Sequence, residues 1–153
     1  MTFPNVIEVA ALVVAGTMVG NELAVALFVH PSISRLDDPA HSQAAKGLAH
    51  VLGAAMPFWY VLTLILNLLV VFVARVKWST PWWLAVASAA IFAAIIIYTL
   101  IAPAPLNSRI AHWDLNALPS DWKQMRRRWD LMHAIRCVFL VAALVLLVVS
   151  LVM

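Results

Sequence analysis

Four polar or aromatic residues near the C-terminal end recur at helical spacing: Arg126, Trp129, His133 and Arg136. Successive members of this helical stripe are three, four and three residues apart, so they share one face of an α-helix. Histidine exchanges protons near neutral pH, and arginine can stabilise a developing anion. The stripe therefore predicts acid–base chemistry, with His133 as the base and Arg136 as the cation. Arg127 and Arg128 fall off this face, and we interpret them as anchors at the membrane surface.

A carboxylate lies inside the first apolar segment, where it needs a partner. Glu22 follows Asn21 deep in a run of apolar residues. A charged group at the bilayer centre costs about 2.5–3.5 kcal/mol on insertion scales, so it is usually paired or functional. Arg136 lies about 15 Å beyond Arg126 along a helix, deeper than a surface anchor needs to be. We therefore expect Glu22 to contact Arg136. A protonated carboxyl, a purely structural ion pair, and a metal or substrate ligand are the alternatives.

Histidines at three segment ends could supply metal ligands together with Glu22. His30 ends the first apolar segment, His50 begins the second and His133 begins the fourth, and these ends lie at one membrane face. No HxxxH or CxxC pattern occurs, so no metal motif is complete within one helix. The cofactor stays open between none, a transition metal and haem. The candidate metal ligands are Glu22, His30, His50 and His133.

The connection after the third apolar segment is long enough to take part in a site. It contains Asn107 and Arg109, and its stretch "RIAHWDLNAL" could form a short helix along the membrane interface. Long loops in compact domains often bind ligands or cover sites. We expect Arg109 to help stabilise an anion and Asn107 to hydrogen-bond a substrate, with His50 and Trp129 as further substrate contacts. A plain amphipathic surface segment is the alternative.

The composition places these residues in a membrane protein. Of 153 residues, 65% are hydrophobic and 11% are charged, and the mean hydropathy is +0.96. Soluble domains carry about 25% charged residues. The sequence predicts one domain, residues 1–153, which is an all-α four-helix bundle in the membrane. Its long third loop could carry a short interfacial helix. The segments long enough to span a bilayer are approximately 6–30, 46–74, 81–102 and 129–152.

Several motifs occur in order along the chain. They are "GNEL" and a following "HP" in the first segment, "PLN-R" after the third, and "W---H--R" at the start of the fourth. As a set they resemble the anthrone-oxygenase-like family of small four-helix membrane proteins over nearly the whole chain. The resemblance implies oxidation of an activated aromatic carbon by molecular oxygen, as in the conversion of anthrone to anthraquinone. It implies site positions at Glu22, Asn107, Arg109, Trp129, His133 and Arg136.

Two functions fit the sequence. The first is a membrane-embedded oxidoreductase that oxidises a hydrophobic activated aromatic or quinol-like substrate near the inner end of the bundle. The second is a non-enzymatic protein that binds lipid, quinone or a partner membrane complex. We expect membrane lipid and a small hydrophobic substrate as partners, and no nucleic acid, because no soluble basic surface remains to bind it. Gly16 and Gly20 would let another helix approach closely, so the chain could form a homo-oligomer.

The distribution of positive charge predicts the orientation of the chain in the cell membrane. Eight Lys and Arg residues lie on the side of the first and third connections, against Arg75 and Lys77 on the side of the termini. By the positive-inside rule, both termini are outside the cell. Reporter fusions after Met153 and within residues 103–128 test this orientation. We expect an external C-terminus and a cytoplasmic loop, and a cytoplasmic C-terminus would overturn the assignment.

Overall fold

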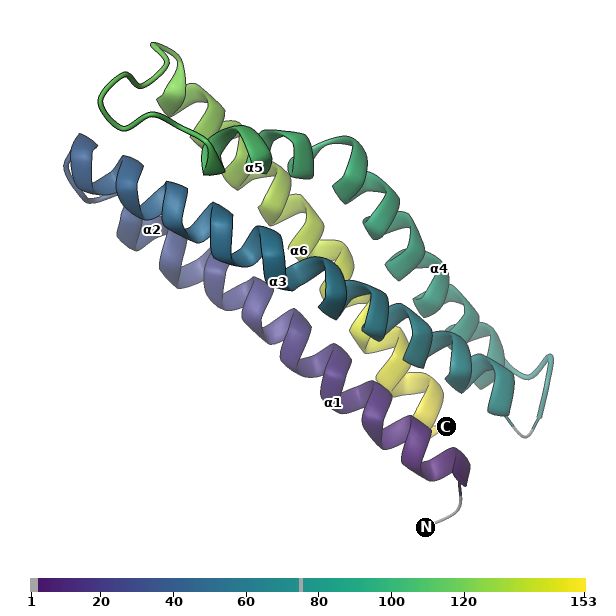
Figure 1. Ribbon diagram of the computed structural model, residues 1–153. Coiled ribbons are helices and arrows are strands. Elements are labelled where there is room, and N and C mark those ends of the chain that lie inside the picture. The colour runs from purple at the N-terminus through teal and green to yellow at the C-terminus, as the bar shows by residue number, and fades with distance from the viewer. Residues whose placement is uncertain (1–2, 75) are drawn as a thin grey trace.

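The computed structural model describes residues 3–74 and 76–153, and all regular structure among them is helical. Four long helical rods lie side by side, with both termini and the turn before Thr80 at one end (Figure 1). Four helices of the described chain are long and apolar enough to cross a membrane, which confirms the predicted fold class. Arg75, used in the charge count above, lies outside the described residues. The elements are α1 (Phe3–Ala24), the π-turn η1 (Val25–Val29), α2 (His30–Ile33), α3 (Asp38–Val73), α4 (Thr80–Ile101), α5 (Pro103–Ala111) and α6 (Trp122–Val152).

Two spans begin about two turns before the residues that apolarity predicts. α3 begins at Asp38 rather than near residue 46, because the Asp37 carboxylate caps it by accepting a hydrogen bond from the Ala40 backbone N–H at 3.1 Å. α6 begins at Trp122 rather than near residue 129. Apolar runs mark the part of a helix that lies in lipid. Helices continue beyond that part, where water and headgroups solvate their polar side chains.

The half of the bundle near the termini is packed with apolar side chains. Phe92, Met18, Leu140 and Leu147 are fully buried there. Ala15 of α1 is buried in the same core, where its small side chain lets α1 pack closely against the neighbouring helices. The predicted Gly16 and Gly20 face is not used within the chain, because a Cβ at either position would meet nothing within 4 Å.

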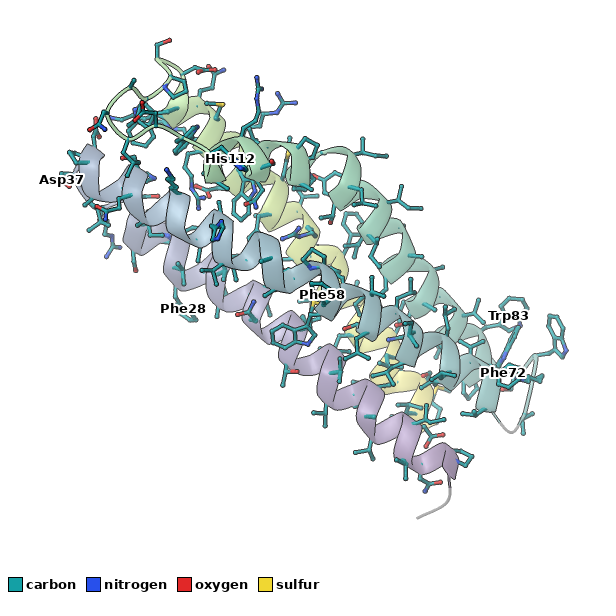
Figure 2. All side chains as sticks on the ribbon, viewed as in Figure 1. Phe28, Asp37, Phe58, Phe72, Trp83 and His112 are labelled. Carbon is teal, nitrogen blue, oxygen red and sulfur yellow. The ribbon has the colours of Figure 1, made fainter. Side chains whose placement is uncertain are left out.

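The outer surface of the bundle is apolar, as a lipid-facing surface must be. Phe28, Phe58 and Phe72 point away from the rods (Figure 2), and they are 68%, 80% and 77% exposed. A water-soluble protein rarely exposes so many large apolar side chains together. The exposed surface therefore supports the membrane assignment independently of helix length.

The other end of the bundle has a second core, built from aromatic residues of the third connection. Trp113, Trp122 and Trp129 are buried there with Ile110. These tryptophans therefore lie inside the protein rather than on its surface. The short helix predicted in this connection is present as α5, but it begins at Pro103 and ends at Ala111. Most of "RIAHWDLNAL" is therefore irregular.

α5 is attached to α3 by one close polar contact. The Asn107 side-chain amide donates to the Ala49 carbonyl oxygen at 2.9 Å. The approach is possible because residue 53 is glycine: a Cβ on Gly53 would lie 2.8 Å from Asn107 Nδ2. Lys46 adds a second link, since its ammonium group donates to the Trp113 carbonyl oxygen at 2.7 Å. These contacts hold the third connection over the end of α3.

We expect Gly53→Ala to displace Asn107 and loosen α5. Removing one hydrogen bond costs about 0.5–1.5 kcal/mol. Gly47→Ala is the matched control, because Gly47 also lies in α3 and its added Cβ would meet nothing within 4 Å. Replacing glycine by alanine within a helix stabilises the protein by about 0.5–1 kcal/mol in both variants. The difference in stability between the two variants therefore measures the cost of displacing Asn107. Thermal unfolding in detergent should place Gly53→Ala below Gly47→Ala, and equal stabilities would contradict the proposed attachment.

Candidate functional site

The face that α6 buries is the helical stripe predicted from the sequence. Arg127 and Arg128, predicted to be anchors, are exposed between the buried positions. Two arginines on this helix are therefore held inside the protein while their neighbours face outward. The buried members are Arg126, Trp129, His133 and Arg136.

Three buried side chains from α1 and α6 form one polar group, which we call the Glu22 cluster: Glu22, His133 and Arg136. Arg136 Nη2 donates to Glu22 Oε2 at 2.7 Å, which is the contact expected from the sequence. The same Nη2 lies 2.8 Å from His133 Nδ1, and Nδ1 lies 3.3 Å from Glu22 Oε2. Glu22 is 2% exposed and His133 is 1% exposed. The ion pair therefore replaces the hydration that both charges lose on burial.

The contacts of His133 determine which of its ring nitrogens can accept a proton. Nε2 lies 3.1 Å from the Glu22 backbone carbonyl oxygen. A carbonyl oxygen only accepts hydrogen bonds, so Nε2 carries a hydrogen. In the neutral ring, the lone pair is then on Nδ1, which accepts a hydrogen bond from Arg136 Nη2 at 2.8 Å and lies beside the Glu22 carboxylate. His133 therefore exchanges protons on the side of Glu22.

The π-turn η1 aligns a second histidine with Glu22. His30 lies eight residues after Glu22, and in a regular α-helix that separation would rotate it about 80° from Glu22. η1 lies between them, and the His30 backbone N–H donates to the Val25 carbonyl oxygen. Such a wide turn adds one residue, which reduces the rotation to about 20°. Both side chains consequently face α6, and the His30 ring centroid lies 4.9 Å from that of His133.

The second histidine belongs to a polar group of its own, which we call the Asp130 cluster: His30, Asp130 and Arg126. Asp130 Oδ1 lies 3.3 Å from His30 Nδ1 and 2.8 Å from Arg126 Nη2. Asp130 lies one turn beyond Arg126 on α6, and only 26% of its side chain is exposed. Each cluster thus contains one carboxylate, one histidine and one arginine.

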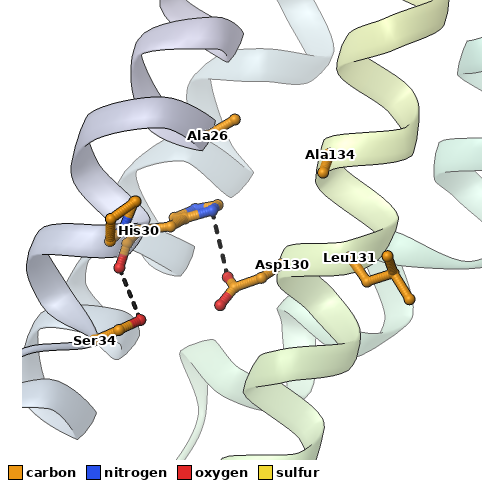
Figure 3. A pocket seen from close by; sticks show the side chains of 7 residues that line it. Ala26, His30, Ser34, Asp130, Leu131 and Ala134 are labelled. Carbon is orange, nitrogen blue, oxygen red and sulfur yellow. Dashed lines mark hydrogen bonds and ion pairs between the residues drawn. The ribbon is translucent and has the colours of Figure 1, made fainter.

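A pocket of about 360 Å³ lies against the Asp130 cluster, between α2 and α6. Figure 3 shows the His30 ring reaching across this space toward Asp130, with Ala26 and Ala134 on the two facing helices. Glu22 and His133 do not line the pocket. His30 is therefore the residue that contacts both the pocket and the ring of His133. The full lining is Ala26, His30, Pro31, Ser34, Asp130, Leu131 and Ala134.

Some residues that contact the Glu22 cluster were not predicted for the site, and Cys137 and Tyr60 are two of them. Cys137 Sγ lies 3.5 Å from the Glu22 carbonyl oxygen and 3.7 Å from His133 Nε2. Its position four residues after His133 was the signal that it shares the stripe. The Tyr60 ring lies under Arg136, with the guanidinium carbon 5.5 Å from the ring centroid. No pattern in the sequence of α3 indicates that Tyr60 meets Arg136.

Three residues predicted for the site lie away from both clusters. Arg109 is exposed on α5, about 100° around the helix from the buried Ile110. Asn107 is engaged with the Ala49 carbonyl oxygen rather than a cavity. His50 is exposed, because the neighbouring Ala49 occupies the face of α3 that packs under α5. All three residues lie at the same end of the bundle as the clusters, but on helix faces that do not point toward them.

The candidate metal ligands do not converge as a set. Among the residues that the structure describes, the donor atoms that lie within 4.8 Å of one another belong to Glu22, His133 and Cys137. His30 and His50 are not part of that group. The Arg136 guanidinium already lies 2.7 Å from the Glu22 oxygen and 2.8 Å from His133 Nδ1. A metal ion using both donors would have to displace this cation.

We expect a strong energetic coupling between Glu22 and Arg136. Arg136→Met leaves the carboxylate buried without a cation, and breaking such a pair costs about 3–5 kcal/mol. Adding Glu22→Gln removes the orphaned charge, so the double variant should be more stable than the sum of both single losses predicts. Denaturant unfolding in detergent gives the free energy of unfolding of the unsubstituted protein, of each single variant and of the double variant. Arg127→Met is the control and should change stability by about 0.5 kcal/mol or less. Strictly additive losses would argue against a charged pair.

Comparison with known proteins identifies the family. Residues 47–146, about two thirds of the chain, match the sequence model of the anthrone oxygenase family. The match includes the stripe on α6 but not Glu22 or His30, so it is shorter than the resemblance of the motifs suggested. No curated protein and no solved structure matches the chain. The matched segment covers more than half of the sequence, and the chain therefore belongs to the anthrone oxygenase family.

Proposed function

We propose that this protein is a membrane-embedded oxidoreductase that oxidises the activated ring carbon of a hydrophobic aromatic substrate with molecular oxygen. The single observation that carries the proposal is a pair of adjacent histidine–carboxylate contacts, each with a buried arginine, of which the one between His30 and Asp130 lines a pocket. Family membership supports this reaction class. The apolar surroundings suit a substrate that dissolves in lipid.

The proposed reaction requires a proton acceptor, a stabilised anion and oxygen. In an anthrone-type substrate, a CH₂ group beside the ring carbonyl system loses a proton and becomes an electron-rich enolate. The enolate carbon bonds to one end of O₂, and a proton converts the product to a hydroperoxide. Loss of water from this group leaves a new C=O. One substrate and one O₂ thus give one quinone and one water, with the carbon oxidised and the oxygen reduced.

The residues of both clusters supply the proposed roles. A histidine held by a carboxylate accepts the proton. In His133 the nitrogen with the lone pair is Nδ1, and a proton there would replace the hydrogen bond from Arg136. The arginines stabilise negative charge at a buried position, where an electrostatic contact is stronger than in water. Substrate in the pocket would lie against His30 and one ring contact away from His133. The protein would act mainly by generating and holding the enolate.

The test is oxidation of anthrone by the purified, monodisperse protein in lipid nanodiscs. Oxygen uptake and anthraquinone formation are measured together, and the spontaneous rate in protein-free nanodiscs is subtracted. We expect His133→Ala to lower the catalysed rate by about 10²-fold or more, which is typical for loss of an acid–base group. Arg136→Ala should have an effect of similar size, because the anion loses its cation.

The matched control is the double substitution Arg127→Ala with Arg128→Ala. Both arginines lie on α6 between stripe members, but they are exposed. The double variant should therefore retain nearly all of the catalysed rate. If it loses activity as fully as His133→Ala, the buried stripe has no special role. Binding of anthrone without any catalysed oxygen uptake would support a non-enzymatic binding protein instead.

A further inference from the structure

Three buried atoms of α1 and α6 form a compact triangle beside the Glu22 cluster: His133 Nε2, Cys137 Sγ and the backbone carbonyl oxygen of Glu22. Nε2 lies 3.1 Å from the carbonyl oxygen, Sγ lies 3.5 Å from it, and Nε2 and Sγ are 3.7 Å apart. His133 is 1% exposed and Cys137 is 4% exposed. A nitrogen, a sulfur and an oxygen atom thus converge in the protein interior, at the ring nitrogen of His133 that Arg136 does not contact.

The dimensions of this triangle match those of a metal site. A point equidistant from the three atoms lies about 2.0 Å from each, and metal–nitrogen and metal–sulfur bonds in zinc sites are about 2.0 Å and 2.3 Å long. His133 and Cys137 are also four residues apart on α6, the spacing at which two side chains of one helix can bind a common ion. An ion at this point leaves the 2.7 Å contact between Arg136 and the Glu22 carboxylate in place.

Donor type and charge select the ion. Thiolate and imidazole ligands suit Cu(I) and Zn(II). A Cu(I) ion on the Cys137 thiolate adds no net charge, because it replaces the thiol proton, which leaves to water. Zn(II) would add one uncompensated positive charge to an interior where Glu22 and Arg136 already balance each other, and burying an unpaired charge is costly. Zn(II) also takes four ligands in closed sites, whereas the triangle offers three.

We propose that His133 Nε2 and Cys137 Sγ form a binding site for Cu(I), with the Glu22 carbonyl oxygen as a third, weaker ligand. Binding moves the ring proton of His133 from Nε2 to Nδ1, which lies 3.3 Å from Glu22 Oε2 and donates to it in place of accepting from Arg136. A carboxylate that holds the second nitrogen of a metal-binding histidine is a common supporting contact. The inference goes beyond the proposed function. Copper would compete with the base, because a protonated Nδ1 cannot accept a proton from a substrate.

Anaerobic titration with Cu(I) tests the site directly. The full chain in detergent, without a histidine tag, competes for Cu(I) with bicinchoninate, a chelator that is coloured when it holds the ion. We expect one Cu(I) per chain. Cys137→Ala and His133→Gln should each lower the affinity by about 100-fold or more, since even supporting residues contribute about 10–100-fold. An unsubstituted chain that binds no Cu(I), or either variant with unchanged affinity, would overturn the proposal.

Two further variants separate the proposed ligands from their neighbours. His50→Gln is the matched control for His133→Gln, because His50 is exposed on α3, and its affinity for Cu(I) should be unchanged. Glu22→Gln keeps the backbone carbonyl and removes only the supporting charge, so it should lower the affinity by about tenfold. A loss as large as that of Cys137→Ala would mean that the carboxylate itself binds the ion, and would overturn the proposed set of ligands.

X-ray absorption at the copper edge tests the geometry in the unsubstituted protein, where no variant can disturb the fold. We expect one sulfur neighbour at about 2.3 Å and one imidazole nitrogen at about 2.0 Å. Cys137 is the single cysteine of the chain, so the sulfur signal should disappear in Cys137→Ala. Two sulfur neighbours, or none, would overturn the site.

Competition between ions tests the argument from charge. An equal amount of Zn(II) should not displace the bound Cu(I), and displacement would overturn the assignment to a monovalent ion. None of these measurements uses an aromatic substrate. Failed anthrone oxidation by a protein that binds Cu(I) as expected would therefore refute the proposed function alone.

Discussion

The ion pair between Glu22 and Arg136 is the interaction on which the rest of the structure depends. Neither charge could remain alone in the apolar interior of a membrane bundle, because lipid offers no water to solvate it. Their 2.7 Å contact joins α1 to α6, which are the first and last elements of the chain. Once these two helices are held together at this depth, the neighbouring residues of each helix must also meet. The polar site follows from that single requirement.

The residues that meet form two groups of the same composition. Glu22 from α1 is paired with His133 and Arg136 of α6, whereas His30 of α2 is paired with Asp130 and Arg126 of α6. The carboxylate and the histidine of each group therefore come from opposite helices. The π-turn η1 makes this possible by rotating His30 onto the face that carries Glu22. A regular helix would have directed one of the two side chains elsewhere.

The two ends of the bundle serve different purposes. Near the termini the helices meet through apolar side chains such as Phe92 and Leu140, which specify packing. At the other end α5 and the buried tryptophans close the bundle over the polar residues, and this cover is attached through Asn107 and Gly53. The pocket lies to the side, between α2 and α6, rather than under this cover. A lateral position suits a ligand that arrives through the lipid.

The sequence by itself determined the four membrane helices, the buried stripe on α6 and the contact between Glu22 and Arg136. Long apolar runs, helical periodicity and the cost of a lone charge in lipid are all local in origin. The tertiary structure alone decided that Asp130 and Cys137 lie in contact with the two clusters and that His50 and Arg109 do not. Those outcomes depend on the rotation of each helix about its axis. That rotation is determined by packing against other helices, by η1 and by the docking of α5, none of which is encoded in residue spacing.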